Sequence, residues 1–584
     1  MEDADQFDED LIEYAIRESL RDSSLFLTFS ARLNSLRTVS ADYLRIVAAI
    51  EQADVCTLQN LSGSQAFLER DSRGWLPLHQ AAVLGQELIL DQVILESCDE
   101  TLEDVTADGD TPLILAVQNG LLENIKKLLH YGASPNTTNS LNESPLLLAV
   151  RQGTYEMVST LIIGGAFVEQ TCLKKRSAIH EAAEAGCSDI IKLLLRNGAM
   201  VNARDGHNVS PLGLAAENGH AEVLDILIQN GGDVHAQAYN GDTVLYDAAG
   251  SGDLDCIDLL LQAGADPNIA SLACELPIHR AAYEGHFLAL KTLIPITTDR
   301  AITLSGHSPV HTAADGGHVD CLRLLIETGF DINAQLATHM SESYGDLRRT
   351  PLYFAVSNND VTCTETLLAA GAKTDLDPLP CLIVAVRAGR YEMVRLLVSW
   401  GAEVNCYFTM ISDTSFPTAL QYCFRDPRML RLLLNCGYDA DKCFLCSHSR
   451  EQDMNQLNKE ICTSVQFCEM INLLSVVNVA GSIVRMLLDY VTHPRLCPSL
   501  LQLLKRQRQW AEIFDILANP RSLQHQCRLV IRNEMTPKKL NNPEFLAAVP
   551  LPPTIKHYLT YKEYDEYGDF GAIPIKNVMN MLKN

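Results

Sequence analysis

The sequence lacks long hydrophobic runs and is poor in basic residues. No uninterrupted apolar segment approaches the roughly 18 residues of a membrane span, and residues 1–5 lack the basic and apolar regions of a signal peptide. The chain has 46 basic against 73 acidic residues, and its net charge of −27 would repel nucleic acid and anionic membranes. We therefore expect a cytoplasmic or nuclear protein that binds neither.

A disulfide framework and a complete metal motif are also missing. The 18 cysteines are scattered through apolar, helix-like segments, as is typical of buried, reduced thiols. Only Cys443-x2-Cys446-x-His448 has a spacing that suits metal ligands, and Cys462 and Cys468 are too loosely placed to form a second pair. We expect no metal and no cofactor.

Signatures of catalysis are missing as well. There is no G-x4-G-K-[ST] phosphate loop and no G-x-S-x-G nucleophile elbow. His180-Glu181 begins like a zinc-protease helix, but Glu184 occupies the position of the second histidine ligand. The double Cys/His pairing of a RING domain is not found either. We expect no catalytic residues.

What the sequence does have is a fixed period. Pro145, Ala178, Pro211, Val244 and Pro277 each lie 33 residues after the last. Each is followed by Ala after four residues, by Gly after four more, and then by a second apolar run. The Gly suits the left-handed end of a short first helix, so each unit predicts two helices joined by a tight break. A period of this length indicates a solenoid.

The units resemble the ankyrin repeat in Pro77-Leu78-His79, in Pro277-Ile278-His279 and in the closing segment Gly264–Asn268. The resemblance implies an all-α solenoid of helix-turn-helix repeats with short hairpin loops, about eleven repeats over residues 71–445. We expect capping helices over residues 26–70 and a helical cap and connector over residues 446–519. Further units begin near Pro112, Pro309, Pro351, Cys381 and Pro417.

Two departures from the period predict local features of the structure. Asn359 stands where other units have the helix-ending Gly, and Asn is the residue that best tolerates the left-handed region after Gly. The spacing from Pro309 to Pro351 is 42, which places an insertion between Leu336 and Arg349. This insertion is either a tolerated surface loop or part of a binding face. The recurrent histidines at positions 79, 180, 279 and 311 fit the ankyrin position where histidine hydrogen-bonds between loops.

Near the C-terminus, Leu523, Cys527 and Ile531 follow one another at four-residue spacing, which predicts a single stripe on a helix. Asn519-Pro520 suits the start of this helix and Pro537 its end. Arg528 and Arg532 would lie beside the stripe. The stripe fits a partner-binding helix or, alternatively, a terminal helix packed on the solenoid.

A second element follows this helix. Val549-Pro550-Leu551-Pro552 predicts a stiff, extended segment that presents apolar side chains. Ile555, Tyr558 and Leu559 suit a short helix after it. A segment of this kind is preorganised for docking.

Together these two elements resemble a SOCS box over residues 520–575, followed by a tail over residues 576–584. The resemblance implies that Leu523, Cys527 and Ile531 bind elongin B and C, with Ser522 at the small-residue position of the motif. It also implies that Val549, Pro550, Leu551 and Pro552 bind a cullin of the fifth type with its RING partner. The family motif has Leu where this chain has Val549. The whole chain thus resembles the ankyrin repeat and SOCS box family.

Residues 1–25 form an acidic arm. Within it, Ile12, Ala15 and Ser19 lie on one helical face after Asp8-Glu9-Asp10, similar to a ubiquitin-interacting motif. This similarity implies that ubiquitin is a further partner. The alternative is a charged amphipathic arm without a ligand.

The resemblance implies a non-catalytic substrate receptor of a cullin-RING ubiquitin ligase. The repeats would bind an unknown protein substrate, and the SOCS box would couple it to elongin and cullin for ubiquitylation and degradation. The alternatives are an ankyrin scaffold without ligase coupling and an enzyme with an unrecognised site.

Overall fold

The computed structural model of the protein describes residues 39–97, 99–345, 348–408, 413–446, 464–473 and 475–561. The chain divides into two compact units. Unit 1 comprises Met1–Ala281 and Leu288–Ser305, and unit 2 comprises Ala282–Phe287 and Gly306–Asn584. Within the described ranges both units are helical, and extended pairing is confined to two isolated β-bridges. The predicted all-α fold is confirmed.

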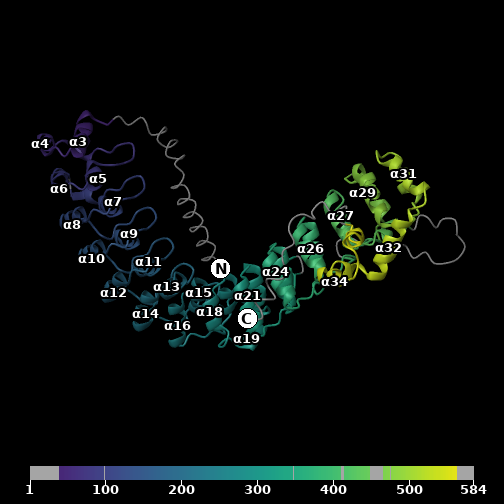
Figure 1. Cartoon of the computed structure of the whole chain (residues 1–584). Coiled ribbons are helices and arrows are strands. Elements are labelled where there is room, and N and C mark those ends of the chain that lie inside the picture. Colours follow the sequence, from purple (N-terminus) through teal and green to yellow (C-terminus); the bar gives the residue numbers. More distant parts are fainter. Residues whose placement is uncertain are drawn as a thin grey trace. The chain divides into compact units, whose positions relative to one another are not determined.

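Unit 1 is a stack of helix pairs, preceded by three further helical elements at its start (Figure 1). The elements before the first pair are α3 (Ala41–Glu51), α4 (Val55–Asn60) and η1 (Gln65–Leu68). The helices of the stack are α5 (Pro77–Ala82), α6 (Glu87–Glu96), η2 (Asp99–Glu103), α7 (Pro112–Gln118), α8 (Leu122–His130), α9 (Pro145–Arg151), α10 (Tyr155–Ile163), α11 (Ala178–Glu184), α12 (Ser188–Arg196), α13 (Pro211–Glu217), α14 (Ala221–Gln229), α15 (Val244–Ser251), α16 (Leu254–Gln262), α17 (Pro277–Glu284), α18 (Phe287–Leu293) and α19 (Asp299–Ser305).

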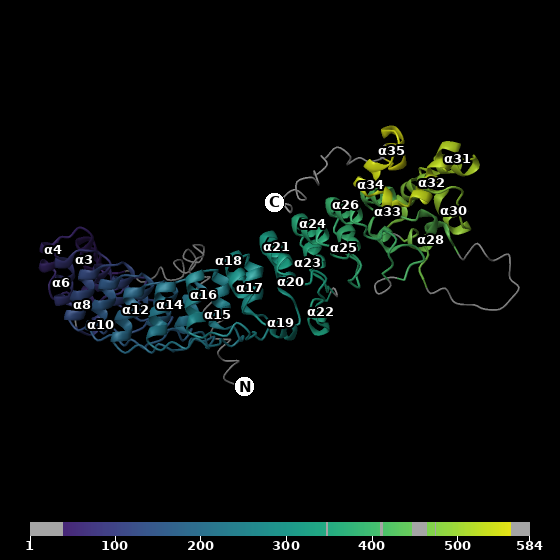
Figure 2. The same cartoon turned by 60° about the horizontal axis from the view of Figure 1, so that its bottom comes forward.

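Successive pairs of unit 1 pack in two rows. First helices pack on first helices, as α9 does on α7 and α11, and second helices pack on second helices, as α10 does on α8 and α12 (Figure 2). The stack begins with α3, which packs on α5. Each pair therefore buries its apolar face only against its neighbours, as in other solenoids.

The 33-residue period fixes where each helix begins and ends. Pro145 is the first residue of α9, and the hydroxyl of Ser144 accepts a hydrogen bond from the Leu147 amide. After α11 the backbone of Gly186 turns into the left-handed region, with φ of 70°. Asn359 takes the same conformation at φ 60° in unit 2, as its place in the period predicts.

Small residues make close packing of the first helices possible. Ala149, Ala182 and Ala215, which recur at the period, are fully buried. A larger side chain at these positions would push neighbouring helices apart or force an unfavourable rotamer, because protein interiors are close-packed. The repeated alanine is therefore a packing residue.

Two of the recurrent histidines connect adjacent repeats. His79 accepts a hydrogen bond from the Leu76 amide at Nδ1, and its Nε2 donates to the Asp104 carbonyl at 3.0 Å. His311 bonds at Nδ1 with the Ser308 amide and at Nε2 with the Arg349 carbonyl, also at 3.0 Å. Both rings are neutral in this arrangement, since one nitrogen must accept. Burial lowers the pKa of both to about 4.

Lowering the pH from 7 to 5 is expected to destabilise both units through these histidines. In the unfolded chain a histidine has a pKa of about 6.5, so it takes up a proton that the buried ring takes up only near pH 4. The stabilisation is thus present above the unfolded pKa and is lost as the pH falls. We expect a loss of about 2 kcal/mol per histidine by pH 5.

Urea unfolding followed at pH 7 and pH 5 measures this loss. His79→Gln and His311→Gln should each reduce the difference between the two pH values. The exposed His235 serves as the control, because His235→Gln should leave the difference unchanged. Equal unfolding midpoints for the unmodified chain at both pH values would contradict the expectation.

Unit 2 contains the remaining helix pairs and the C-terminal helices. The paired helices are α20 (Pro309–Gly316), α21 (Val319–Glu327), α23 (Pro351–Ser357), α24 (Val361–Ala369), α25 (Cys381–Arg387), α26 (Tyr391–Ser399), η3 (Thr418–Tyr422) and α27 (Pro427–Asn435), and the short helix α22 (Thr338–Ser343) lies between the first two pairs. The later elements are η4 (Ala440–Phe444), α28 (Phe467–Met470), η6 (Val477–Val479), α29 (Ala480–Leu487), η7 (Leu488–Tyr490), α30 (Pro498–Leu504), α31 (Trp510–Ala518), α32 (Leu523–Met535), α33 (Pro537–Leu540), α34 (Pro543–Ala548) and α35 (Pro553–Leu559).

Unit 2 departs from the expected pattern in two places. The insertion between Leu336 and Arg349, expected to be a loop, contains the short helix α22. It is held by the Tyr344 ring, which lies edge-on against Phe354 at 5.5 Å between centroids. The first helix of the unit that begins near Pro417 is the 3-10 helix η3, a tighter form used in short pieces.

Candidate partner-binding site

Helix α32 carries the predicted stripe. Its N-cap is Ser522, whose hydroxyl accepts a hydrogen bond from the His525 amide at 3.2 Å. The expected start at Asn519-Pro520 is wrong, because Asn519 instead ends α31 and its side chain donates to Asp515. Its amide group is therefore already engaged with the helix before it. The helix ends at Met535, before Pro537, as expected.

The stripe faces away from the protein. Leu523 is 76% exposed, Val530 beside it is 60% exposed, and Ile531 is 39% exposed. Cys527 is exposed as well. Large apolar side chains are exposed together along one face of this helix. Such a face is typical of a helix that docks into a groove on a partner.

The opposite face of α32 is anchored by two buried arginines. Arg528 is 4% exposed and its guanidinium lies 3.3 Å from the centre of the Tyr558 ring. Arg532 is 5% exposed and donates hydrogen bonds to the carbonyls of Asn435, at 2.8 Å, and Leu559. These bonds fix α32 between α27 and α35. Charged groups are seldom buried unless they are paired, so this anchoring is specific.

The polarity of α32 is thus inverted relative to an ordinary surface helix. Its arginines point inward and its aliphatic side chains point outward. The alternative interpretation of the stripe, a terminal helix packed on the solenoid by its apolar face, places Leu523 and Cys527 inside. The exposure of both side chains is incompatible with that packing.

The predicted docking segment lies between α34 and α35. Val549 and Pro552 have extended backbones, with ψ of 128° and 146°. Val549 and Leu551 are half-buried, whereas Pro550 and Pro552 are exposed. The short helix expected to follow is α35, and it is fixed to α32 because the Tyr558 hydroxyl donates to the Gln524 carbonyl at 3.0 Å. The helix that follows the segment is therefore attached to α32.

The third predicted site lies outside the described residues. Ile12, Ala15 and Ser19 precede residue 39, where the description begins. The ubiquitin contact stays a prediction from the sequence.

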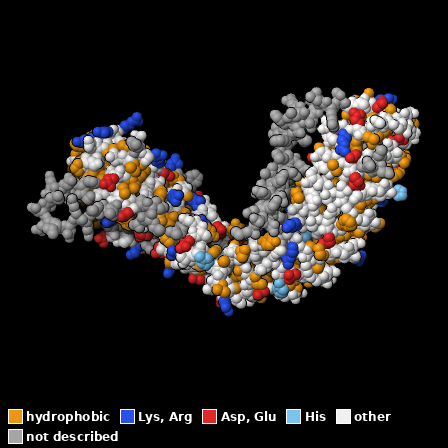
Figure 3. All heavy atoms as spheres, turned by 180° about the vertical axis from the view of Figure 1, so that it is seen from behind, with side chains coloured by type: hydrophobic (Ala, Val, Ile, Leu, Met, Phe, Trp, Pro, Cys, Tyr) orange, Lys and Arg blue, Asp and Glu red, His pale blue; other side chains and the backbone are white. Residues whose placement is uncertain are grey.

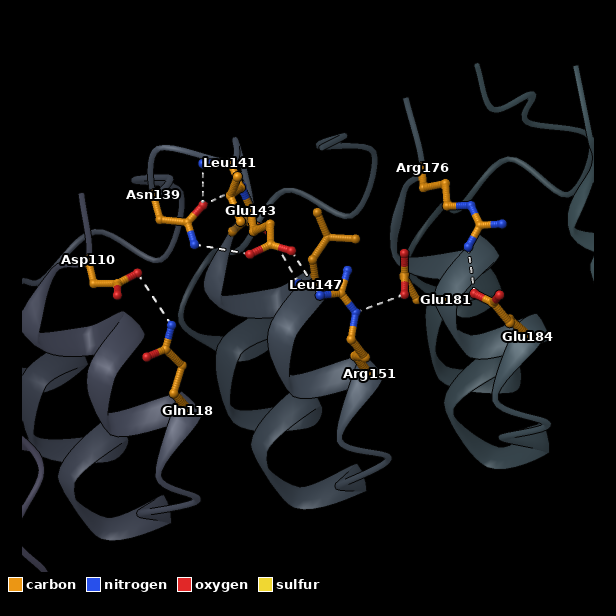
Figure 4. Close-up of polar contacts among 11 residues, drawn as sticks. Asp110, Gln118, Asn139, Leu141, Glu143, Leu147, Arg151, Arg176, Glu181 and Glu184 are labelled. Carbon is orange, nitrogen blue, oxygen red and sulfur yellow. Dashed lines mark hydrogen bonds and ion pairs between the residues drawn. The ribbon is translucent and has the colours of Figure 1, made fainter. Parts of the chain in front are cut away.

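A cleft of about 350 Å³ opens beside α9 and α11 in unit 1. Its wall contains a row of ion pairs (Figure 4). Arg151 donates to Glu143 at 2.8 Å and to Glu181 at 3.1 Å, and Arg176 donates to Glu184 at 2.6 Å. Five of the lining residues carry charges of both signs, namely Arg151, Lys174, Arg176, Glu181 and Glu184, and the other two are Cys172 and Ala185.

Arg151 compensates for the burial of two carboxylates in this row. The side chains of Glu143 and Glu181 are only 3% and 7% exposed, and Arg151 bonds both carboxylates. A buried carboxylate is costly unless it is hydrogen-bonded, and Arg151 supplies those bonds. The neighbouring carboxylates raise the pKa of the Arg151 guanidinium against the opposing effect of burial, which is the largest single influence. The row connects adjacent repeats and shapes the cleft.

The surface has no single basic face on the side seen in Figure 3, where Lys and Arg side chains are interspersed with Asp and Glu. Among the helices that the structure describes, none is both long enough and apolar enough to cross a bilayer.

Cys443 and Cys446, which form the metal-like spacing of the sequence, have different neighbours in the structure. Cys443 is buried, and its sulfur lies 3.9 Å from the Tyr438 hydroxyl. Cys446 instead lies near Cys468, at 3.5 Å between sulfurs. His448 and Cys462 lie outside the described residues.

The sequence did not reveal which residues anchor the site. Arg528 and Arg532 were expected only beside the stripe, yet both are buried. No motif in the sequence includes Tyr561, and its ring is fully buried against both guanidinium groups. Two arginines at four-residue spacing opposite an apolar stripe are the one signal that could have pointed to them.

Comparisons with known families match the repeats and the C-terminal helices separately. A SOCS box model matches residues 519–560. Ankyrin repeat models match residues 46–139, 132–205, 201–271, 273–336, 310–368 and 380–407. The ankyrin matches end before the C-terminal helices, and the SOCS box match contains α32, α33, α34 and α35.

Individual relatives share both parts in one chain. Ankyrin repeat and SOCS box protein 14 from Mus musculus is 56% identical over 544 residues, 92% of each chain. The Homo sapiens protein of the same description is 51% identical over 537 residues, 91% of each chain. Ankyrin repeat and SOCS box protein 2 from Homo sapiens is 36% identical over 282 residues, 46% of this chain and 44% of that protein. On this likeness over nearly its whole length, the chain belongs to the ankyrin repeat and SOCS box family.

Proposed function

We propose that the protein is the substrate-recognition subunit of a ubiquitin ligase built on elongin B and C and a cullin of the fifth type with its RING partner. The observation that carries this proposal is the exposed apolar face of α32 on a helix whose other face is anchored. Membership of the family supports a substrate-receptor role in a cullin-RING ligase. In this proposal Leu523, Cys527 and Ile531 contact elongin.

The ankyrin stack would hold the protein substrate. Ligase subunits bound at the C-terminal helices would then transfer ubiquitin to it and commit it to proteasomal degradation. The contribution of this chain is proximity, which converts an encounter between substrate and activated ubiquitin into a reaction within one assembly. No side chain of this protein takes part in the transfer.

The cleft beside α9 and α11 supports a substrate contact on the stack. Its charged walls suit a polar peptide with charges of both signs, rather than an apolar ligand. Ligand sites in solenoids lie along their extended surfaces, where neighbouring repeats contribute side chains together. The cleft shares this property, since α9 and α11 belong to adjacent repeats.

Copurification of the full chain tests the ligase assignment. The tagged chain should retain elongin B, elongin C, the cullin and the RING protein together, and the purified assembly should build ubiquitin chains on a captured substrate. The second candidate is a scaffold that tethers partners through its repeats. A chain that captures repeat-binding partners but no elongin would establish the scaffold and contradict the proposal.

Changing Val549 to Leu is expected to strengthen cullin binding about fourfold, because one additional buried methylene contributes about 0.8 kcal/mol. Val549 is half-buried at the start of the docking segment, and in this proposal the additional methylene of Leu is buried against the cullin. Calorimetric titration of the elongin-bound chain with the cullin measures the change.

Pro550 and Pro552 provide the matched comparison, since both are exposed. Pro550→Ala and Pro552→Ala should weaken cullin binding because they loosen the extended backbone, and elongin affinity should be unchanged. Equal cullin affinities for all three variants and the unmodified chain would exclude this segment as the cullin contact.

A further inference from the structure

Three cysteine thiols meet in unit 2, between the last helix pair of the stack and the helices that precede α32. The sulfurs of Cys446, Cys468 and Cys497 all lie within 4.8 Å of one another. Cys468 and Cys497 are buried, and Cys446 is half-buried. The thiols come from positions 22 residues (468 − 446) and 29 residues (497 − 468) apart, so the fold, not local sequence, brings them together.

Packed elements hold each of the three positions. Cys446 follows η4, and Cys468 lies in α28, which packs on η4. Cys497 is the N-cap residue of α30, immediately before Pro498. The residue before Cys468, Phe467, is fully buried among three other rings, those of Phe416, Phe424 and Phe444.

We propose that Cys446, Cys468 and Cys497 are the three protein ligands of a bound zinc ion. Zinc bound to sulfur at about 2.3 Å in a tetrahedron places neighbouring sulfurs about 3.8 Å apart. The separation of 3.5 Å between the Cys446 and Cys468 sulfurs and the upper limit of 4.8 Å for the group lie on either side of that value. Thiolates are soft ligands that favour zinc over magnesium or calcium.

The chemistry of binding is proton exchange. Each thiol loses its proton to solvent as its sulfur takes a place on the metal, and no electron is transferred. Three sulfurs leave the fourth tetrahedral position to a water molecule. The ion would neutralise two of the three thiolate charges.

A disulfide accounts for fewer of the three sulfurs than a zinc ion does. It would use two of the sulfurs and leave the third buried beside the bond. The Cys446 and Cys468 sulfurs are also 3.5 Å apart, whereas a disulfide requires about 2.05 Å. The Cys443-x2-Cys446 pair of the sequence is not an alternative metal pair, because Cys443 lies outside the group and contacts the Tyr438 hydroxyl.

The site would stabilise the connector to the SOCS box. A zinc ion on these three sulfurs links η4, α28 and α30, and α30 leads into α31 and α32. The metal would therefore fix the helices through which the exposed stripe is attached to the repeats. This inference does not depend on which partner the stripe binds.

Metal analysis of the purified full chain tests the proposal. Chain expressed in zinc-supplemented medium and purified without chelator should hold about one zinc per molecule by mass spectrometry of the metal. Cys446→Ser, Cys468→Ser and Cys497→Ser should each lose nearly all of it. Cys443→Ser, in the spacing motif, and Cys187→Ser, half-buried in unit 1, should retain it.

Because a serine variant can fail to fold, two measurements use the unmodified chain. Titration with an organomercurial should release the zinc as three thiols react, and cobalt substitution should give intense thiolate-to-cobalt absorption. A zinc-free chain without a cobalt band would overturn the proposal. So would a disulfide between Cys446 and Cys468, or zinc retained at one equivalent in all three ligand variants.

Discussion

Replacing Leu523 and Cys527 together by alanine is expected to reduce elongin affinity at least about 100-fold, which corresponds to about 2.7 kcal/mol. Both side chains are exposed in the free chain, Leu523 by 76%, so the replacement removes no internal packing. The full loss falls on the interface, where each buried aliphatic side chain contributes about 1.5–3 kcal/mol. Unfolding of the free variant should match that of the unmodified chain.

Copurification and calorimetric titration with elongin B and C measure this effect. The matched control is Asn533→Ala, since Asn533 is exposed on the same helix but outside the stripe, and the variant should bind elongin normally. Wild-type elongin affinity in the double variant would show that another surface makes the contact. The ligase proposal would then lose the observation that carries it.

The solenoid could be predicted from the sequence because its signals are local and repeated. Pro145, Ala178 and Pro211 each begin a helix in the structure, as the period predicts. Proline at the first helical position and glycine at the left-handed end act within a few residues of themselves, so no tertiary knowledge is needed to place them. The same holds for Asn359, whose φ of 60° is set by its place in the period.

The start of α32 and the contents of the insertion were predicted wrongly for local reasons too. Asn519 is a good cap residue, but its side chain bonds back to Asp515 and Ser522 caps the helix instead. Ser522, three positions after Asn519, is therefore a competing signal for the start of the helix. Residues 336–349 break the period, which predicts a loop, and a six-residue helix such as α22 leaves little pattern.

Contacts between distant residues could not be predicted. The bond from Arg532 to the Asn435 carbonyl joins positions 97 residues apart, and no spacing in either segment indicates it. The cluster of the Cys446, Cys468 and Cys497 thiols could not be predicted either, since no other cysteine lies near Cys497 in the sequence. Burial of a charged or metal-binding group depends on which elements pack together, which a single sequence does not reveal.

Replacing Arg532 by methionine is expected to detach α32 from unit 2 at a cost of about 3 kcal/mol. The guanidinium donates to the carbonyls of Asn435 and Leu559 and lies 4.8 Å from the centre of the Tyr561 ring. Methionine is similar in length but leaves both buried carbonyls without these charged donors, and hydrogen bonds to charged groups contribute about 1.5–3 kcal/mol each. Burial lowers the pKa of Arg532, because removing the charge from water costs free energy. Part of the free energy of its two hydrogen bonds offsets that cost, so the net loss in the variant is smaller than their sum.

Hydrogen exchange of the α32 amides measures the detachment. We expect exchange about 100-fold faster in Arg532→Met, since an opening free energy lowered by about 3 kcal/mol raises the open population by that factor. Arg506→Met, which changes an exposed arginine, should leave the exchange of α32 unaltered. The exposed stripe lies on the other face of α32. Under the proposed function, the variant should therefore retain elongin binding but transfer less ubiquitin to a substrate held on the repeats. Unchanged exchange would mean that the box is held by its remaining contacts, and the anchoring role of Arg532 would be wrong.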